Sequence, residues 1–294
     1  MSWERKVIAV TGANGLLGSH LVRFFQSRGA TVHALVRKSA TTAFQPPNRK
    51  VFRCDLPGSI DESGLVGVDA LIHCAYMTRF TTLTEAIKVN QEGSNRLYQL
   101  SKKLEIKQFV FISSTSAHED AASYYGRSKF ALESEFSHPD DLVIRPGLIV
   151  SSEGGLFHRM VKTVTRLPVL PIFNGGRQIV QTVHIDDLTA IIAAALGRQL
   201  TGILTVAEQE STTMKGLLLA IADQLRLKRL TASVPLWPVL KLLQLCERIG
   251  MRLPVTSENL LGLTSLRFCP PSPELKSLGM PIRAWRDSIR GVNA

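Results

Sequence analysis

The sequence has little that would mark a membrane-spanning, metal-binding or disulfide-bonded protein. No apolar run reaches the roughly eighteen residues that a transmembrane helix needs, and residues 1–6 lead directly into an apolar strand. Its four cysteines are Cys54, Cys74, Cys246 and Cys269, which form no C-x-x-C pair. These absences predict a cytoplasmic chain with no signal peptide, no metal site and reduced thiols.

Acidic residues are scarce relative to basic ones. Lys and Arg total 35 against 24 Asp and Glu, and most of the excess lies in residues 159–294, with 17 against 9. The basic residues are scattered and no nucleic-acid motif accompanies them, so the sequence predicts no nucleic-acid partner. A solvated basic surface is one interpretation; an anionic substrate, a membrane surface or an acidic partner is the other.

The most informative stretch is residues 7–18, which read V-I-A-V-T-G-A-N-G-L-L-G. An apolar strand passes into a glycine turn and then into a predicted helix to residue 27. Gly12 permits the tight turn, Gly15 lets a pyrophosphate approach the backbone, and Gly18 lets the helix pack against the strand. The helix N-terminus then faces the phosphates, so the stretch predicts a dinucleotide site. The residues expected to line it are Gly12, Asn14, Gly15, Leu16, Leu17 and Gly18.

Further predicted strands cover residues 31–36, 51–56, 70–75, 108–112 and 142–147, and the ends of three of them bear on the cofactor. Arg37 follows the second strand, where a cation would pair with a 2′-phosphate, so NADP is preferred over NAD. Asp55 and Leu56 end the third strand beside the expected adenine. Cys74 and Ala75 end the fourth along the cofactor.

A tyrosine and a lysine after the fifth strand form the candidate catalytic pair. Tyr125 and Lys129 are four residues apart in a predicted helix, so they share one face. A neighbouring ammonium is expected to lower the pKa of the phenol toward working pH, as a general acid/base for an alcohol and ketone requires. Thr115 is expected to hold the substrate oxygen.

Two other predicted helices leave alternatives open. Asn90 falls on the inward side of a helix predicted over 83–104, where it is either a buried hydrogen-bonding strut or part of a water relay. A helix over 235–249 carries an apolar stripe that is expected to be core, with membrane or partner docking as the second interpretation. The stripe comprises Leu236, Val239, Leu240, Leu243 and Cys246.

Taken in order, the motifs resemble the extended short-chain dehydrogenase/reductases, the NAD-dependent epimerase/dehydratase family. The resemblance covers nearly the whole length and rests on residues 11–18, Asp55-Leu56, Asn90, Ser114-Thr115, Tyr125-x-x-x-Lys129, Arg145-Pro146 and residues 184–187. It implies a doubly wound α/β Rossmann sheet over 1–150, joined by a returning segment near 181–200. It also implies a smaller substrate domain over 151–180 and 201–294.

The resemblance implies roles for the site residues as well. Tyr125 is the implied acid/base, Lys129 anchors the nicotinamide ribose, and Thr115 orients the substrate oxygen. Asn90 and Pro146 join the expected cofactor contacts, and Met77, His118, Arg177 and His184 are candidate substrate contacts.

Val180 departs from the family pattern, because nucleotide-sugar members commonly have an arginine there that grips the substrate diphosphate. Arg177 is the expected replacement. The predicted function is hydride transfer at a secondary alcohol or ketone carbon of a small, anionic or nucleotide-sugar substrate, by an oxidoreductase or an epimerase. The alternative is a non-catalytic NADP-binding assembly or regulatory subunit on the same fold. Family members are often dimers, so a homodimer is expected.

Overall fold

The computed structural model describes residues 2–37, 48–251 and 255–291, and they form two compact units. Unit 1 comprises residues 1–113, 130–144 and 188–204, and unit 2 comprises residues 114–129, 145–187 and 205–294. The chain therefore passes between the units several times. Each unit is described in turn.

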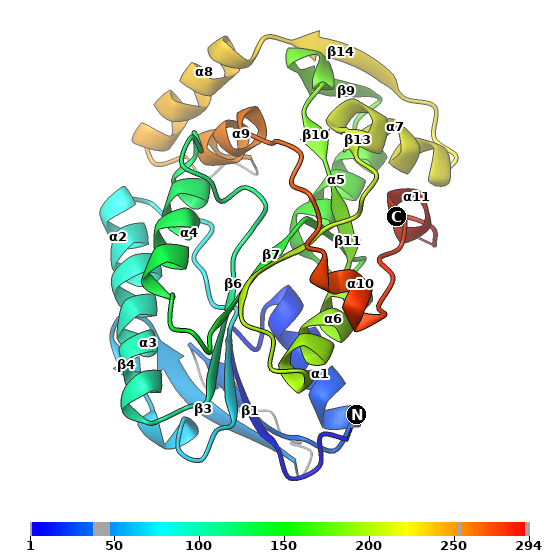
Figure 1. The fold of residues 1–294 in the computed structure, drawn as a ribbon. Coiled ribbons are helices and arrows are strands. Elements are labelled where there is room, and N and C mark those ends of the chain that lie inside the picture. The colour runs from blue at the N-terminus through cyan, green and yellow to red at the C-terminus, as the bar shows by residue number, and fades with distance from the viewer. Residues whose placement is uncertain (1, 38–47, 252–254, 292–294) are drawn as a thin grey trace. The chain divides into compact units, whose positions relative to one another are not determined.

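An eight-stranded sheet forms the framework of unit 1, with the strand order β12-β7-β6-β5-β1-β2-β3-β4 (Figure 1). Strands β1, β2, β3, β5, β6 and β7 pair in parallel, whereas β4 runs antiparallel to β3. The order reverses between β1 and β5, as in doubly wound nucleotide-binding sheets, so the predicted fold class is confirmed. The strands are β1 (Val7–Thr11), β2 (Thr31–Val36), β3 (Arg49–Asp55), β4 (Ser59–Ile60), β5 (Ala70–His73), β6 (Gln108–Ile112), β7 (Leu142–Pro146) and β12 (Gly202–Val206).

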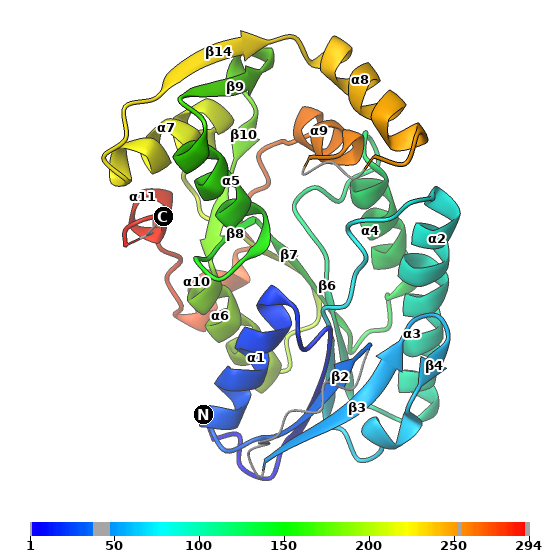
Figure 2. The same cartoon turned by 180° about the vertical axis from the view of Figure 1, so that it is seen from behind.

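Helices cover both faces of this sheet (Figures 1 and 2). Helices α1 (Leu16–Ser27) and α6 (Ile185–Gly197) lie on one face, and α2 (Leu83–Ile87), α3 (Gly93–Lys103) and α4 (Tyr124–Glu135) lie on the other. The central strands are buried on both sides, which explains their continuous apolar sequences. A cluster of aromatic rings from α3, β6 and the end of α4 fills the second face: Tyr98, Phe109, Phe111 and Phe136.

The helix predicted over 83–104 is interrupted. Residues Lys88–Glu92 form a π-helical segment between α2 and α3, and Asn90 lies in it. A π-helical turn fits an extra residue into the helix and rotates the following residues. The apolar spacing predicted the overall length well, but it does not reveal this interruption.

Unit 2 is built from small two-stranded sheets and helices. Strand β8 (Leu148–Val150) pairs with β11 (Thr182–His184), β9 (Val169–Phe173) with β14 (Leu230–Val234), and β10 (Ile179–Val180) with β13 (Thr212–Thr213). A core centred on Phe157, Val164 and Leu217 joins α5 to α7. The helices are α5 (Gly155–Arg166), α7 (Met214–Gln224), α8 (Leu236–Arg248), α9 (Ser257–Thr264), α10 (Glu274–Leu278) and α11 (Trp285–Ser288).

Within the described residues, no helix combines the length and the apolar character needed to span a membrane.

Candidate functional site

The glycine turn of unit 1 lies between β1 and α1. Gly12 has a φ of +62°, and a Cβ built on it would lie 2.9 Å from the backbone nitrogen of Ala75. Gly15 donates to the Gly12 carbonyl at 2.7 Å, and a Cβ on Gly18 would overlap that same carbonyl. Any side chain at Gly12 or Gly18 would therefore push the turn away from β5 or from α1.

The start of α1 leaves room for an anion. Asn14 and Gly15 are exposed, and of the first two helical residues Leu16 is half-buried and Leu17 is buried. Within the described residues, no side chain caps α1 and its first turn carries no acid. Uncapped N–H groups at a helix N-terminus bind phosphate oxygens. The turn thus fits the pyrophosphate of a dinucleotide.

A buried hydrogen-bond chain fixes the adjoining ends of β1 and β5. Thr11 Oγ1 accepts from the N–H of Ala75 at 3.1 Å and lies 2.7 Å from His73 Nδ1, while His73 Nε2 lies 2.9 Å from Ser94 Oγ. His73 is fully buried, and both of its ring nitrogens have hydrogen-bond partners, as a core histidine requires. These hydrogen bonds hold the backbone of Cys74 and Ala75 directly against Gly12.

The ends of β2 and β3 present polar side chains. Arg37 follows β2 and is exposed. Asp55 ends β3, and its carboxylate lies 3.8 Å from the Arg53 guanidinium with both side chains largely exposed. Leu56 is buried in the core of unit 1.

The side-chain amide of Asn90 hydrogen-bonds twice to the backbone of one residue, Met77. Its Oδ1 accepts from the N–H of Met77 at 2.7 Å, and its Nδ2 donates to the Met77 carbonyl at 2.9 Å. Asn90 is 1% exposed. Of the two roles left open, these contacts favour the strut, which holds the segment after β5 against the π-helical turn.

In unit 2, Tyr125 lies in the first turn of α4 with a hydroxyl beside it. A hydrogen bond from the Ser114 side chain lowers the pKa of Tyr125, but burial raises it more, so the net shift is upward. The downward shift expected from Lys129 is therefore wrong for this structure, because desolvation of the phenolate dominates. Lys129 lies one turn along α4 and is 3% exposed.

The hydroxyl that contacts Tyr125 belongs to Ser114, a residue that the sequence interpretation did not select. Thr115 is held through its backbone: its N–H donates to the Pro146 carbonyl at 3.0 Å, and its carbonyl accepts from Cys269 Sγ at 3.4 Å. His118 is 3% exposed, and its Nε2 lies 2.9 Å from the Ser265 carbonyl. The segment that precedes Tyr125 is thus held by hydrogen bonds to Pro146, Cys269 and Ser265.

The start of α4 is held by a carboxylate from α9. Glu258 accepts from the N–H of Tyr124 at 2.7 Å and also from the N–H of Tyr125. Burial raises the pKa of Glu258, and these two N–H groups and the nearby Arg127 act against that rise. Helix α9 is itself fixed by a capping box between Thr256 and Asn259.

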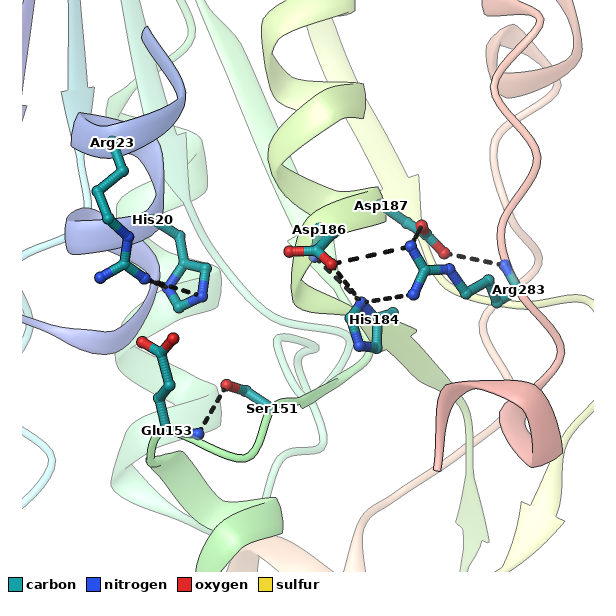
Figure 3. A network of polar contacts seen from close by, with 8 residues as sticks. All are labelled: His20, Arg23, Ser151, Glu153, His184, Asp186, Asp187 and Arg283. Carbon is teal, nitrogen blue, oxygen red and sulfur yellow. Dashed lines mark hydrogen bonds and ion pairs between the residues drawn. The ribbon is translucent and has the colours of Figure 1, made fainter. Parts of the chain in front are cut away.

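His184 belongs to a polar cluster at the start of α6 (Figure 3). Arg283 Nη1 lies 3.1 Å from His184 Nδ1, and Arg283 Nη2 lies 3.0 Å from Asp187 Oδ1. A guanidinium can only donate, so His184 Nδ1 is the acceptor in this contact, and the same nitrogen lies 3.5 Å from Asp186 Oδ2. Asp186 and Asp187 lie in the first turn of α6, where their carboxylates interact favourably with the helix N-terminus.

The position of the absent family arginine is part of the core. Val180 is 4% exposed and packs in the apolar cluster of unit 2. Arg177 lies outside that cluster and is exposed.

A cavity of about 520 Å³ lies in unit 1. Its lining includes Lys6, Ala70 and Gln108, which begin strands or precede them. Ligands of such sheets bind beyond the carboxyl ends of the strands, so this cavity lies at the opposite edge.

Known proteins were compared with the chain in sequence and in structure. A model of the family described as "NAD dependent epimerase/dehydratase family" matches residues 8–205. Ceramide reductase of Caulobacter vibrioides is 28% identical over 209 residues, which cover 69% of this chain and 65% of that protein. The match therefore spans slightly less than two thirds of that relative's length.

Two further proteins are similar over longer shares of their own length. A dTDP-4-dehydro-6-deoxy-D-allose reductase of Streptomyces bikiniensis is 24% identical over 231 residues, which cover 63% of this chain and 71% of that protein. The solved UDP-N-acetylglucosamine 4-epimerase of Methanobrevibacter ruminantium M1 superposes with a TM-score of 0.74 at 15% identity, over 98% of this chain and 97% of its own. At that identity the structural likeness shows the fold alone.

Proposed function

Because the chain belongs to the NAD-dependent epimerase/dehydratase family, we propose that it is an NAD(P)-dependent reductase that converts a ketone to a secondary alcohol. One observation carries this proposal: the Tyr125 phenol accepts a hydrogen bond from Ser114, and Lys129 lies one turn further along the same helix. The intact set supports an enzyme over the alternative of a non-catalytic assembly subunit.

A bound nicotinamide supplies the hydride in this family's chemistry. The Ser114 hydroxyl orients the ketone oxygen, and Tyr125 donates its phenolic proton to that oxygen as the alcohol forms. The Tyr125 phenol, whose pKa burial raises, holds its proton at neutral pH and has a proton to donate. The two reductases among the relatives support reduction as the working direction. The roles of Thr115 in orienting substrate and of Lys129 in anchoring ribose stay predictions.

The cofactor residues are proposed on the fit of the glycine turn. Gly12, Gly15 and Gly18 admit a pyrophosphate, and the uncapped start of α1 binds it. Exposed Arg37 pairs with the 2′-phosphate of NADP, which makes NADP the preferred dinucleotide. Unit 1 is accordingly the cofactor domain and unit 2 the substrate domain. The remaining expected cofactor contacts are Asp55, Leu56, Cys74, Ala75 and Pro146.

The substrate is proposed to lack a nucleotide diphosphate. Val180 is buried in the core, so it contributes packing where a diphosphate grip would need an accessible cation. The ceramide reductase relative supports a lipid ketone as the substrate class. A nucleotide-sugar ketone held by exposed Arg177 is the second candidate, and the deoxysugar reductase relative favours it. Met77, His118 and His184 stay candidate substrate contacts.

Deuterium transfer tests the proposal and separates the two substrate classes. The protein is incubated with NADPH deuterated at nicotinamide C4, and with either a keto form of ceramide or a dTDP-4-dehydro-6-deoxyhexose. We expect deuterium at the new carbinol carbon of the ceramide product, measured by mass spectrometry. Deuterium found only in the sugar alcohol would show that the substrate is a nucleotide-sugar ketone and not a lipid ketone. No label in any alcohol, with NADPH still bound, would favour the assembly subunit.

A further inference from the structure

One side of α8 is exposed along its whole length. Residues Trp237, Lys241, Leu242, Leu245, Arg248 and Ile249 form the outer face of α8, since steps of 100° per residue place them on one side of the helix. Trp237 is 68% exposed, and Leu242, Leu245 and Ile249 are all more than half exposed. Met251 and Val255, which follow the helix in sequence, are 50% and 44% exposed.

The opposite side of α8 already provides its packing. The predicted stripe from Leu236 to Cys246 is half-buried, and Figures 1 and 2 show α8 beside α9. Glu247 on this inner side accepts from the N–H and the hydroxyl of Ser257 at 2.6 Å each. The outer face is therefore apolar surface that the fold of unit 2 does not need.

The charges of the outer face have one sign. It carries Lys241 and Arg248, and within the described residues of α8 the sole acid, Glu247, lies on the inner side. Lys241 Nζ lies 4.9 Å from the Trp237 ring centroid. Leucine and tryptophan beside lysine and arginine are the composition of helices that lie in a membrane interface, where long cationic stems reach the headgroups.

We propose that the outer face of α8 docks on an anionic lipid bilayer, with the helix axis in the plane of the interface. A second copy of the chain fits this face less well, because self-pairing would bring its cations together and lysine is depleted from interface cores. Anionic headgroups neutralise both cations while the apolar side chains enter the acyl boundary. The proposal uses no residue of the proposed catalytic set.

Trp237 is a built-in reporter for this docking. The chain has three tryptophans, and Trp3 and Trp285 are only 7% and 5% exposed. The probe is vesicles of phosphatidylcholine with about a third phosphatidylglycerol. We expect a blue shift of the tryptophan emission and cosedimentation, both weakened by high salt and by omitting phosphatidylglycerol. Trp237→Phe should abolish the shift while much of the cosedimentation remains.

Paired variants test which side chains act. Leu245→Ser with Ile249→Ser should weaken vesicle binding about tenfold or more, and Lys241→Gln with Arg248→Gln should remove the preference for anionic lipid. Val66→Ser, at an exposed valine of unit 1, is the matched control and should bind as the wild type does. All these side chains are exposed, so each variant should keep the wild-type near-ultraviolet circular dichroism.

Three results would overturn the proposal. The wild type could stay in the supernatant with its emission unchanged, or the Leu245→Ser, Ile249→Ser double variant could bind vesicles as tightly as the wild type. Sedimentation velocity could instead reveal a dimer that the same double variant dissociates, which would assign the outer face of α8 to a second copy.

Discussion

At the scale of single residues, Asn90 shows how one buried amide fixes a backbone. Replacing it with leucine keeps the volume but leaves the N–H and carbonyl of Met77 without their partner. Each unsatisfied buried group costs about 1–3 kcal/mol, and because these two hydrogen bonds are only part-buried, Asn90→Leu should lower the free energy of unfolding by about 2–4 kcal/mol, the lower part of the summed range. Urea denaturation measures this loss. Gln91→Leu, in the same π-helical segment, is the control, and an equal effect there would reject the strut.

Arg37 is expected to determine the choice of dinucleotide. Arg37→Ala removes the cation proposed to pair with the 2′-phosphate, and NADPH should bind about tenfold more weakly, equivalent to about 1.4 kcal/mol. The dissociation constant of NADH should stay the same, as followed by quenching of protein fluorescence. Arg53→Ala on the next strand is a matched exposed control. Equal weakening of NADPH and NADH binding would show that Arg37 does not select between the two dinucleotides.

Which hydroxyl residue contacts Tyr125 could not be predicted from the sequence. Four hydroxyl residues stand together at 113–116, and successive side chains in an extended segment point in opposite directions. The spacing identified the segment but not the side chain, and Ser114 rather than Thr115 contacts the phenol. The raised pKa of Tyr125 escaped prediction for a related reason, since burial depends on contacts distant in sequence.

At the scale of elements, the start of α4 depends on α9. Glu258→Ala would leave the N–H groups of Tyr124 and Tyr125 without their acceptor and should lower the free energy of unfolding by about 1–2 kcal/mol. Glu258→Gln keeps an acceptor oxygen and should lose less. Urea midpoints of the two variants measure the difference. An alanine variant as stable as the wild type would show that Glu258 does not support this helix.

The strands of the first half follow their sequence patterns closely, and so does the helix predicted over 235–249, which is α8, but two elements of unit 2 do not. Strands β1, β2 and β6 are short apolar runs between turns, which buried parallel strands require. In unit 2, α5 was not predicted, because it begins at Gly155, a residue that disfavours helix and has a φ of +79° here. Strand β9 was not predicted either, because it contains Pro171. A proline is tolerated there because β9 pairs on one side only, with β14.

At the scale of the whole molecule, Glu208 is expected to make stability depend on pH. It accepts from the N–H and hydroxyl of Thr182 at 3.0 Å each and from the N–H of Trp285, and so ties β11 to α11. Burial raises the pKa of Glu208 from 4.5 to about 7. Between these values the folded protein holds a proton that the unfolded chain has released. Stability therefore falls as pH rises from 4.5 to 7, by about 3 kcal/mol in total.

Urea denaturation across this pH range, compared with Glu208→Gln, isolates that contribution. The glutamine variant should lose the pH-dependent part and be less stable at pH 5, because its amide NH2 faces the Trp285 N–H. Parallel pH profiles for the two proteins would show that Glu208 does not titrate in this range.

The architecture of the whole chain was predictable where local and global signals agree. Strand, glycine turn and helix at residues 7–18 define the first βα unit, and the later strands supply the parallel neighbours of β1. The surface of α8 was not predictable in the same way. The inner stripe already gives α8 the apolar spacing of an amphipathic helix. Whether Trp237 on the other side is exposed depends on which elements pack beside α8, and the sequence does not reveal that.

The central claim is that Tyr125 donates the proton in a cofactor-dependent ketone reduction. The most direct measurement compares Tyr125→Phe with Tyr124→Phe, the same change one residue earlier in α4, in turnover of the ketone substrate and in NADPH affinity. We predict that Tyr125→Phe lowers turnover by about 10² or more with unchanged NADPH binding, while Tyr124→Phe keeps most of its activity. Wild-type turnover in Tyr125→Phe would contradict the account.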